Sequence, residues 1–266
     1  MSSIDQYFKD WASKVILSSD DAPLIFVSGA QGIGKSTAMN AIANAFDNQI
    51  AILGIDDFYL TKAERQALAK DTSPLFETRG PPGTHDLVLL NKKIDELQST
   101  DSASITKIPS FDKITDDRKS EKNDHIFNGK AKAIIVEGWL VGANAEPDSV
   151  TESPMNEIEN TESALNWRKY QEDQLSGPYA KLWNRSPHFF HLNAPSFETV
   201  LNWRIEQEET TRGLHKGELP EEIRDWVRSF ILYYERITRR MLDGKKMSGA
   251  QLFVDKNRTV IKFEER

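Results

Sequence analysis

The chain contains no cysteine, and this absence excludes several kinds of chemistry at once. Its 266 residues can form no disulfide, no thiolate nucleophile and no zinc site with cysteine ligands. No run of 18 apolar residues is present, so no membrane-spanning helix is expected. Basic residues are also in deficit, with 34 against 41 acidic ones and a net charge of −7. Because binding to nucleic acids or anionic membranes depends largely on neutralising phosphate groups, we expect neither as a partner.

The chain also lacks a linker rich in proline, glycine and serine, so we expect a single domain over residues 1–266. Its first 17 residues mix charged and apolar side chains at helical intervals. That pattern is typical of an amphipathic helix packed on a domain and differs from a signal peptide. We therefore expect a cytoplasmic location, and the sequence leaves the oligomeric state open.

Short apolar segments alternate with longer segments of helical periodicity. Strands are predicted at 24–27, 50–55, 133–137, 188–192 and 251–254, with a final short strand at 260–263. Helices are predicted at 35–46, 62–70, 87–98, 164–175, 197–211 and 221–242. Apolar strands joined by crossover helices form a parallel sheet that is covered on both faces. The sequence therefore predicts an α/β fold with a doubly wound, mainly parallel five-stranded sheet.

The most informative motif follows the first predicted strand. Residues 29–36 match the Walker A pattern G-x-x-x-x-G-K-[ST], in which backbone N–H groups and a helix N-terminus face phosphates. Lys35 is expected to reach the β- and γ-phosphates, and Ser36 to bind Mg²⁺. A glycine-rich turn that binds no ligand is the alternative. The residues predicted to hold ATP are Gly29, Ala30, Gln31, Gly32, Ile33, Gly34, Lys35, Ser36 and Thr37.

Carboxylates follow the second and third predicted strands, at the sheet edge where ligands gather in such folds. Asp56 and Asp57 come directly after residues 50–55, and one of them is expected to accept the proton of a substrate hydroxyl. Asp56 is also a candidate to help place the metal. Glu137 ends the third strand and is predicted to hold magnesium as a Walker B acid does. A helix cap for the aspartates and a structural ion pair for Glu137 are the alternatives.

Residues 79–86 and 109–118 have the composition of rigid substrate-binding loops, with glycine, proline and several charged side chains. Four of these side chains are candidates to converge on an anion, which predicts a small acidic acceptor: Arg79, His85, Lys113 and Arg118. Asp86 is also a good N-cap for the helix at 87–98. His85 taken alone is more often structural than catalytic, and residues 116–119 are compatible with a solvated turn.

Together these segments resemble the plant-type D-glycerate 3-kinase family, within the uridine kinase and pantothenate kinase-like group of P-loop kinases. The similarity covers the Walker A loop and, in the same order, residues 56–61, 79–86, 109–113, 137–142 and 202–212. The resemblance implies transfer of phosphate from ATP to the 3-hydroxyl of D-glycerate, with Asp56 as the base. The residues then expected at the acceptor are Asp57, Tyr59, Arg79, His85, Asp86, Lys113 and Arg118.

The chain departs from this family at Pro81-Pro82, where plant members carry Asn-Ala, and at Asp116, where they carry glycine. Both positions border the expected acceptor pocket. A kinase for pantothenate or a nucleoside is therefore the alternative among enzymes. A nucleotide-binding regulatory protein without turnover is the alternative of another class.

The resemblance also implies a mobile lid after the helix around Arg204. Residues 211–217 form a basic loop with two glycines, which fits a lid at 204–220 that closes over ATP. Arg204 and Arg212 are predicted to stabilise the transferring phosphoryl group. An ordinary connection between two helices is the alternative.

Residues 144–163 are predicted to be an insertion of a different character. The stretch 146–162 holds six acidic residues and no basic one. Uncompensated charge of one sign favours contact with water over packing. We therefore expect a solvated, mobile segment that forms no site.

Overall fold

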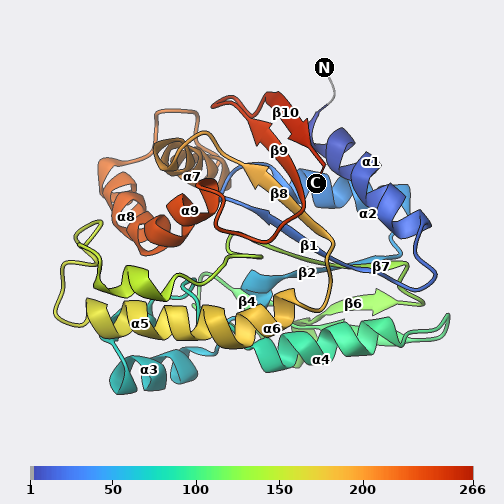
Figure 1. Ribbon diagram of the computed structural model, residues 1–266, viewed down its shortest axis with the longest axis horizontal. Coiled ribbons are helices and arrows are strands. Elements are labelled where there is room, and N and C mark those ends of the chain that lie inside the picture. Colours follow the sequence, from blue (N-terminus) through green and yellow to red (C-terminus); the bar gives the residue numbers. More distant parts are fainter. Residues whose placement is uncertain (1–2, 266) are drawn as a thin grey trace.

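The computed structural model describes residues 3–265 and has a six-stranded sheet at its centre (Figure 1). In the order β10-β9-β8-β1-β7-β2, five neighbouring strands are parallel and β10 runs antiparallel to β9. The strands are β1 (Leu24–Gly29), β2 (Ile50–Gly54), β7 (Ala133–Gly138), β8 (Phe189–Asn193), β9 (Ala250–Val254) and β10 (Val260–Glu264). The predicted α/β fold with a mainly parallel sheet is confirmed, but the sheet has six strands where five were predicted, because the final predicted segment joins it as an antiparallel edge.

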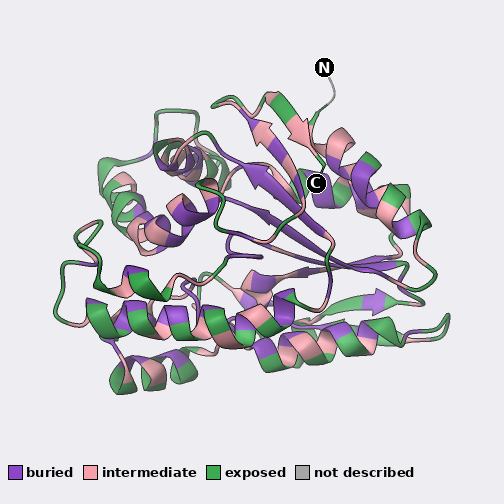
Figure 2. Cartoon of the chain, viewed as in Figure 1, coloured by how far each residue is buried: buried purple, intermediate pink, exposed green. Residues whose placement is uncertain are grey.

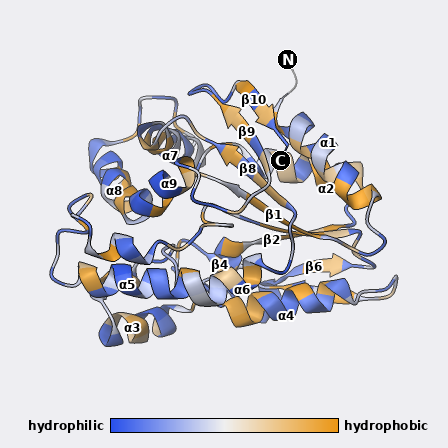
Figure 3. Cartoon of the chain, in the orientation of Figure 1, coloured by the Kyte–Doolittle hydropathy of each residue, from blue (hydrophilic) through white to orange (hydrophobic). Residues whose placement is uncertain are grey.

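Helices cover both faces of this sheet. Phe26 and Phe190 lie on opposite faces of neighbouring strands, because Phe26 is in register with Phe189. The ring of Trp183 packs edge-on against Phe26, whereas Trp11 packs against Phe190. Side chains that are enclosed in this way are mainly apolar, which is why β1 and β7 are hydrophobic runs up to their last two residues (Figures 2 and 3).

Most of the helices begin and end close to their predicted bounds. They are α1 (Ile4–Leu17), α2 (Lys35–Ala45), α3 (Lys62–Asp71), α4 (Leu87–Gln98), α5 (Ala164–Gln174), α6 (Ala180–Trp183), α7 (Phe197–Thr211), α8 (Glu221–Ile231) and α9 (Glu235–Leu242). The expected N-terminal amphipathic helix is α1. Between residues 3 and 265 no helix combines the length and the apolar character needed to cross a membrane.

Several local features differ from the sequence-based expectation. The helix predicted at 221–242 is divided into α8 and α9 by a 3₁₀ turn at Leu232–Tyr234. The helix predicted to end at 175 instead continues through a π-helical turn at Leu175–Tyr179 into α6. Two small two-stranded antiparallel sheets are additional: β3 (Ile105–Ile108) with β6 (His125–Asn128), and between them in the chain the hairpin of β4 (Phe111–Asp112) with β5 (Asp117–Arg118). Strands of two to four residues are too short to give a periodic signal.

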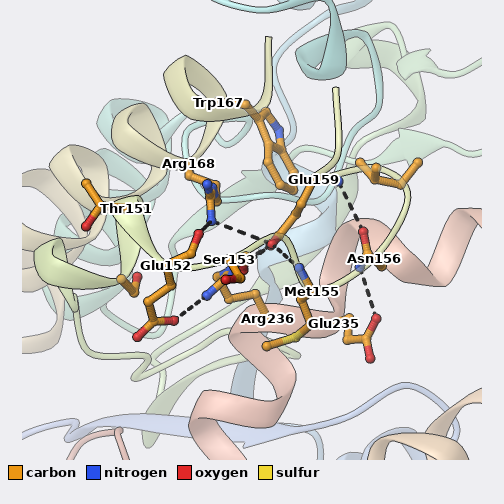
Figure 4. A network of polar contacts seen from close by, with 12 residues as sticks. Thr151, Glu152, Ser153, Met155, Asn156, Glu159, Trp167, Arg168, Glu235 and Arg236 are labelled. Carbon is orange, nitrogen blue, oxygen red and sulfur yellow. Dashed lines mark hydrogen bonds and ion pairs between the residues drawn. The ribbon is translucent and has the colours of Figure 1, made fainter. Parts of the chain in front are cut away.

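The prediction that residues 146–162 are solvated holds for most of the segment, which is exposed, but fails at Glu159. Glu159 in this segment is only 3% exposed, and its carboxylate accepts from Arg236 of α9 at 2.5 Å (Figure 4). Arg168 of α5 lies 3.8 Å from the same carboxylate. Asn156 donates to Glu235 of α9 at 3.0 Å. The acidic segment is therefore docked between two helices that supply the basic partners which it lacks.

We expect Glu159→Gln to lower the free energy of unfolding by about 3 kcal/mol at neutral pH, because removing one member of a buried ion pair leaves Arg236 with only the exposed Glu152 as its counter-charge. Burial alone would raise the pKa of Glu159, but hydrogen bonds and charge from Arg236 outweigh it and lower the pKa. A group with a lowered folded-state pKa stabilises the protein above its unfolded-state value, about 4.3, and loses this effect as the pH falls further. Urea unfolding at several pH values measures the difference.

Glu157→Gln is the matched control, because Glu157 is exposed and belongs to the same segment. Equal unfolding free energies for the Glu159 and Glu157 variants at neutral pH would show that the buried pair does not hold the segment in place.

Candidate active site

The Walker A loop connects β1 to α2, and its backbone requires glycine at two points. Gly32 and Gly34 have φ angles of 73° and 117°, in the left-handed region that side chains disfavour. A Cβ atom on Gly32 would also lie 2.7 Å from Cβ of Trp203. The Lys35 ammonium donates to the carbonyl oxygens of Gly29 and Ala30, at 2.7 and 3.3 Å. The loop thus curls around its own lysine, beside the N-terminus of α2.

Glu137 lies next to this loop because of the strand order. It is in register with Val27 of β1 on one side and with Gly54 of β2 on the other. Burial raises the pKa of Glu137, and the charge of Lys35 opposes that change. Burial likewise lowers the pKa of Lys35, against the charges of Glu137 and Asp56. The structure therefore brings together three side chains that the sequence placed at one sheet edge.

Asp56 is the most heavily engaged of these acids. It follows β2 in the 3₁₀ turn Ile55–Phe58, where Tyr59 donates to it at 2.7 Å and the Lys113 ammonium lies 2.9 Å away. Burial favours the neutral acid, but the charge and hydrogen bond of Lys113 prevail and the pKa of Asp56 is about 2. The side chain is 39% exposed, so solvent weakens this pair. Asp56 is ionised at any physiological pH.

Asp57 has a different environment. Its carboxylate accepts the backbone N–H of Phe111 at 3.2 Å, which attaches the β4–β5 hairpin to the end of β2. Burial raises the pKa of Asp57, and the hydrogen bond from Phe111 opposes this. The two neighbouring aspartates therefore have different partners: Asp56 binds the side chains of Tyr59 and Lys113, whereas Asp57 binds the backbone of a loop.

His85 was predicted to be one of several cations, and that charge state is wrong. The ring is 5% exposed and lies against Tyr59, with the ring centroids 4.7 Å apart. Its Nδ1 atom lies 2.6 Å from the hydroxyl oxygen of Tyr179. Burial lowers the pKa of His85 to about 4, although the charge of Asp56 opposes this. His85 is therefore a neutral part of the site.

Arg79 retains positive charge in excess of its partners. It forms an ion pair with Asp116, and the buried Arg65 binds the same carboxylate at 2.5 Å. Both guanidinium groups lie 5.6 Å from the centre of the Phe111 ring. Because Arg65 and Arg79 share one aspartate, one positive charge beside the 79–86 loop has no counter-charge.

Arg118 and Asp86 are largely occupied with each other. Their ion pair measures 3.2 Å, and Arg118 also donates to the carbonyl oxygen of Tyr59 at 2.9 Å. Asp86 accepts the backbone N–H of Leu89 at 2.9 Å, so it is the N-cap of α4. The alternative interpretation of Asp86 as a helix cap is therefore confirmed. These two residues were expected at the acceptor, and here they brace the loop that carries His85.

The two arginines expected at the lid converge on one acid. Arg204 and Arg212 of α7 and its C-cap lie 2.5 and 2.7 Å from the carboxylate of Glu208. Figure 1 shows α7, α8 and α9 as a group toward which the arrowheads of β1 and β8 point. The phosphate-binding loop lies against α7, because Gly32 is in close contact with Trp203, and both arginines are paired with Glu208.

A cavity of about 700 Å³ beside the loop has no counterpart in the sequence-based prediction. Its lining includes Trp203 and Glu206 of α7, Lys216, Arg224 of α8 and Arg258 of the β9–β10 turn. Arg258 donates to the carbonyl oxygen of Gly32 at 2.7 Å, and its guanidinium lies 4.9 Å from the centre of the Trp203 ring. No motif marks this turn, so the sequence offered no signal for it.

The donors at the loop fit a magnesium ion better than a metal held by protein alone. No group of three histidine, aspartate or glutamate side chains within residues 3–265 is arranged to hold a metal. Mg²⁺ keeps several waters and commonly takes one or two carboxylates together with substrate phosphates. Glu137 has a buried oxygen, Oε2, without a protein partner, and Ser36 is exposed in the first turn of α2. These two residues are suited to the role that the sequence assigned them.

Comparison with known proteins finds kinases among the relatives of this chain, although no protein-family model matches it. The uncharacterized kinase mug58 of Schizosaccharomyces pombe is 29% identical over 79% of this chain and 79% of its own length. The probable ATP-dependent kinase TDA10 of Saccharomyces cerevisiae is 26% identical, over 99% of this chain and 94% of its own. The solved structure of D-glycerate 3-kinase from Cryptococcus neoformans has a TM-score of 0.79 at 22% identity, with 100% of both chains covered.

The predicted resemblance to P-loop kinases is confirmed by these relatives and by the shared fold. The expectation of a nucleotide-dependent kinase, a transferase, is confirmed with it.

Proposed function

We propose that this P-loop kinase transfers the γ-phosphoryl group of ATP to a hydroxyl of a small acidic metabolite, and that the metabolite is D-glycerate, giving 3-phosphoglycerate. The observation that carries the proposal is the convergence of Lys35, Glu137 and the Asp56–Lys113 pair at one sheet edge. The similar fold of a protein named D-glycerate 3-kinase supports the choice of acceptor.

On the nucleotide side, the loop amides and Lys35 would hold the phosphates. Lys35 would exchange its contacts with the carbonyls of Gly29 and Ala30 for the β- and γ-phosphate oxygens. Ser36 and Glu137 would hold Mg²⁺, which neutralises charge on the phosphates. The cavity beside Gly32 is large enough for the adenosine part of ATP, and Arg258 in its lining donates to the carbonyl oxygen of Gly32.

On the acceptor side, Asp56 would accept the proton of the reacting hydroxyl. A carboxylate with a pKa of about 2 is a weak base, so its first role is to orient the hydroxyl by a hydrogen bond. Phosphoryl transfer tolerates this, because bond formation to the nucleophile is limited in a loose transition state. A substrate carboxylate that draws Lys113 away from Asp56 would also raise the pKa of Asp56 and strengthen the base.

The anionic group of the acceptor would bind to Lys113 and Arg79. Lys113 is 61% exposed, and its ammonium pairs only with Asp56 among residues 3–265. Arg79 shares Asp116 with Arg65, so positive charge is left for a substrate carboxylate. Arg118 already forms an ion pair with Asp86, so it would hold the loop that carries His85 in place and would not bind the substrate itself.

The lid is also part of this proposal. Residues 204–220 would close over ATP, and Arg204 and Arg212 would then leave Glu208 for the transferring phosphoryl group. Pairing with Glu208 satisfies both arginines while the lid is open. Glu208 is only 10% exposed, so it would hold both arginines in place until the lid closes.

A nucleoside acceptor lacks a matching surface. A nucleoside needs an aromatic face for its base, and Phe111 is the ring that the acceptor loops offer. Both Arg65 and Arg79 lie over that ring, which leaves little room for a base. The regulatory alternative is disfavoured because Lys35, Asp56 and Glu137 are all present and interact.

We expect D-glycerate to stimulate ADP release from ATP and magnesium, and pantothenate and uridine to have little effect. The carboxylate of D-glycerate is close to the reacting hydroxyl and can form ion pairs with both Lys113 and Arg79. Uridine has no charged group that could do so. A coupled ADP-release assay across the three compounds measures this. Stimulation by uridine or pantothenate without D-glycerate would reassign the acceptor, and stimulation by none of the three would favour the regulatory alternative.

A further inference from the structure

We propose that Tyr179 is a positioning residue of the acceptor site. Its hydroxyl donates to Nδ1 of His85 and so fixes the imidazole proton on Nε2, from which an uncharged N–H is offered to an oxygen of the acceptor. This acceptor oxygen is bonded to the carbon adjacent to the one that carries the reacting hydroxyl. This inference rests on the proposed function for the nature of the acceptor, and on contacts within the chain for everything else.

An irregularity of the chain brings Tyr179 to this position. Residues Leu175–Tyr179 form a π-helical turn between α5 and α6, with Pro178 inside it. Proline has no N–H to donate, and π turns of this kind are frequent at functional sites. The Tyr179 side chain is fully buried, and its hydroxyl oxygen contacts two atoms of the loop that follows Gly80. It accepts the backbone N–H of Gly83 at 3.1 Å and lies 2.6 Å from Nδ1 of His85.

The direction of the second hydrogen bond follows from counting donors. If Nδ1 of His85 carried the proton, Tyr179 would accept twice, its own buried O–H would have no acceptor, and Nε2 would be an unpaired acceptor. If Tyr179 donates to Nδ1 instead, every group is satisfied except the N–H on Nε2. An unsatisfied buried polar group costs about 1–3 kcal/mol, so the second arrangement is preferred.

The remaining unpaired atom belongs to the acceptor site. Nε2 of His85 is buried and has no partner within the described part of the chain. His85 and Tyr59 form an antiparallel β-bridge and their rings stack, while the Tyr59 hydroxyl binds Asp56 at 2.7 Å. Because burial lowers the pKa of His85 to about 4, the ring stays neutral at physiological pH. A buried donor without a partner, beside the acid that orients the acceptor, is explained by a substrate oxygen.

Lys113 gives a route by which the acceptor can reach this atom. Nε2 is covered in the present arrangement, so a substrate oxygen reaches it only after a local movement. Lys113 is held at Asp56 by one ion pair and its side chain is 61% exposed, so we infer that its departure is the movement that admits the acceptor. The same movement delivers its charge to the acceptor carboxylate, which couples recognition of the anion to recognition of the neighbouring oxygen.

Nuclear magnetic resonance of the isotopically labelled full chain tests the relay directly. Imidazole nitrogen shifts, assigned to His85 by the loss of its signals in His85→Gln, should show one neutral tautomer with the proton on Nε2 between about pH 5 and pH 8. Tyr179→Phe should lose this single tautomer. Tyr170→Phe is the matched control, because the Tyr170 ring packs beside Gly83 without bonding to His85. A proton on Nδ1 in the native chain, or an unchanged tautomer in Tyr179→Phe, would overturn the proposal.

Steady-state kinetics test the contact with the acceptor. Losing one neutral hydrogen bond is worth about 1.4 kcal/mol, so Tyr179→Phe should raise KM for D-glycerate about ten-fold, with kcat and KM for ATP little changed. The variant should barely affect 3-hydroxypropanoate, which lacks the neighbouring hydroxyl. Equal effects on both compounds would contradict the assigned oxygen. If D-glycerate fails as an acceptor altogether, the proposed function fails, and the imidazole spectrum still decides whether the relay exists.

Discussion

Replacing Lys35 with alanine should reduce turnover by on the order of 10³-fold while the fold persists. The variant removes the cation that the Walker A loop holds against its own carbonyls, at 2.7 Å from Gly29. Charge that develops on the β- and γ-phosphates would then lose its nearest protein counter-charge. Affinity for ATP should fall less than the rate, because the loop amides and the helix N-terminus remain. Steady-state rates with ATP, Mg²⁺ and D-glycerate, and a binding isotherm for ATP, separate the two effects.

Lys92→Ala is the matched control, since Lys92 is an exposed lysine on α4. Both variants should show the far-ultraviolet spectrum of the native chain. Near-native turnover in Lys35→Ala would mean that the loop does not bind the transferred phosphate. A collapse of the spectrum would instead show that Lys35 supports the loop mainly through its carbonyl contacts.

Asp56→Asn should lower the rate of transfer by on the order of 10²-fold or more, with KM for ATP little changed. The substitution keeps the shape of the side chain and removes both the proton acceptor and the partner of Lys113. The pKa of Asp56 is about 2, below the ordinary value of about 3.9, so the loss does not come from titration at neutral pH. The stabilisation from its ion pair is present above about pH 4 and is lost as the pH falls toward 2.

Asp57→Asn is a matched comparison at the adjacent position. Its amide oxygen can still accept the N–H of Phe111, so the hairpin should remain attached and the loss of rate should be smaller. A larger loss at Asp57 than at Asp56 would exchange their roles. Single-turnover rates for both variants, measured with saturating ATP, give the comparison.

The parts of the fold that local sequence determines were predictable. α4 and α7 begin and end where predicted, because Asp86 and Ser196 accept N–H groups in their first turns and mark the starts. The strands were visible because burial on both faces requires continuous apolar runs. The convergence of Lys35, Asp56 and Glu137 followed from strand ends meeting at one edge.

The contacts of the loop residues were not predictable, because their partners are distant in the sequence. Arg79 pairs with Asp116, 37 positions away, and no spacing rule connects them. His85 was counted as a cation because composition does not reveal burial beneath Tyr179. Similarly, Glu159 looked solvated because its basic partner, Arg236, comes 77 positions later on α9. Pairing across the fold changes the charge state or role of such residues without leaving a local pattern.

The central claim is that a phosphoryl group passes from ATP to a hydroxyl of a small acidic acceptor, and product analysis tests it most directly. Incubating the chain with ATP, Mg²⁺ and D-glycerate and recording phosphorus and carbon resonance spectra identifies the atom that carries the phosphate. We expect a phosphate monoester on the terminal hydroxyl carbon, formed in step with ADP and absent with Lys35→Ala. Free phosphate formed in step with ADP, or a phosphate on the central carbon of glycerate, would contradict the arrangement of acceptor and base described for this site.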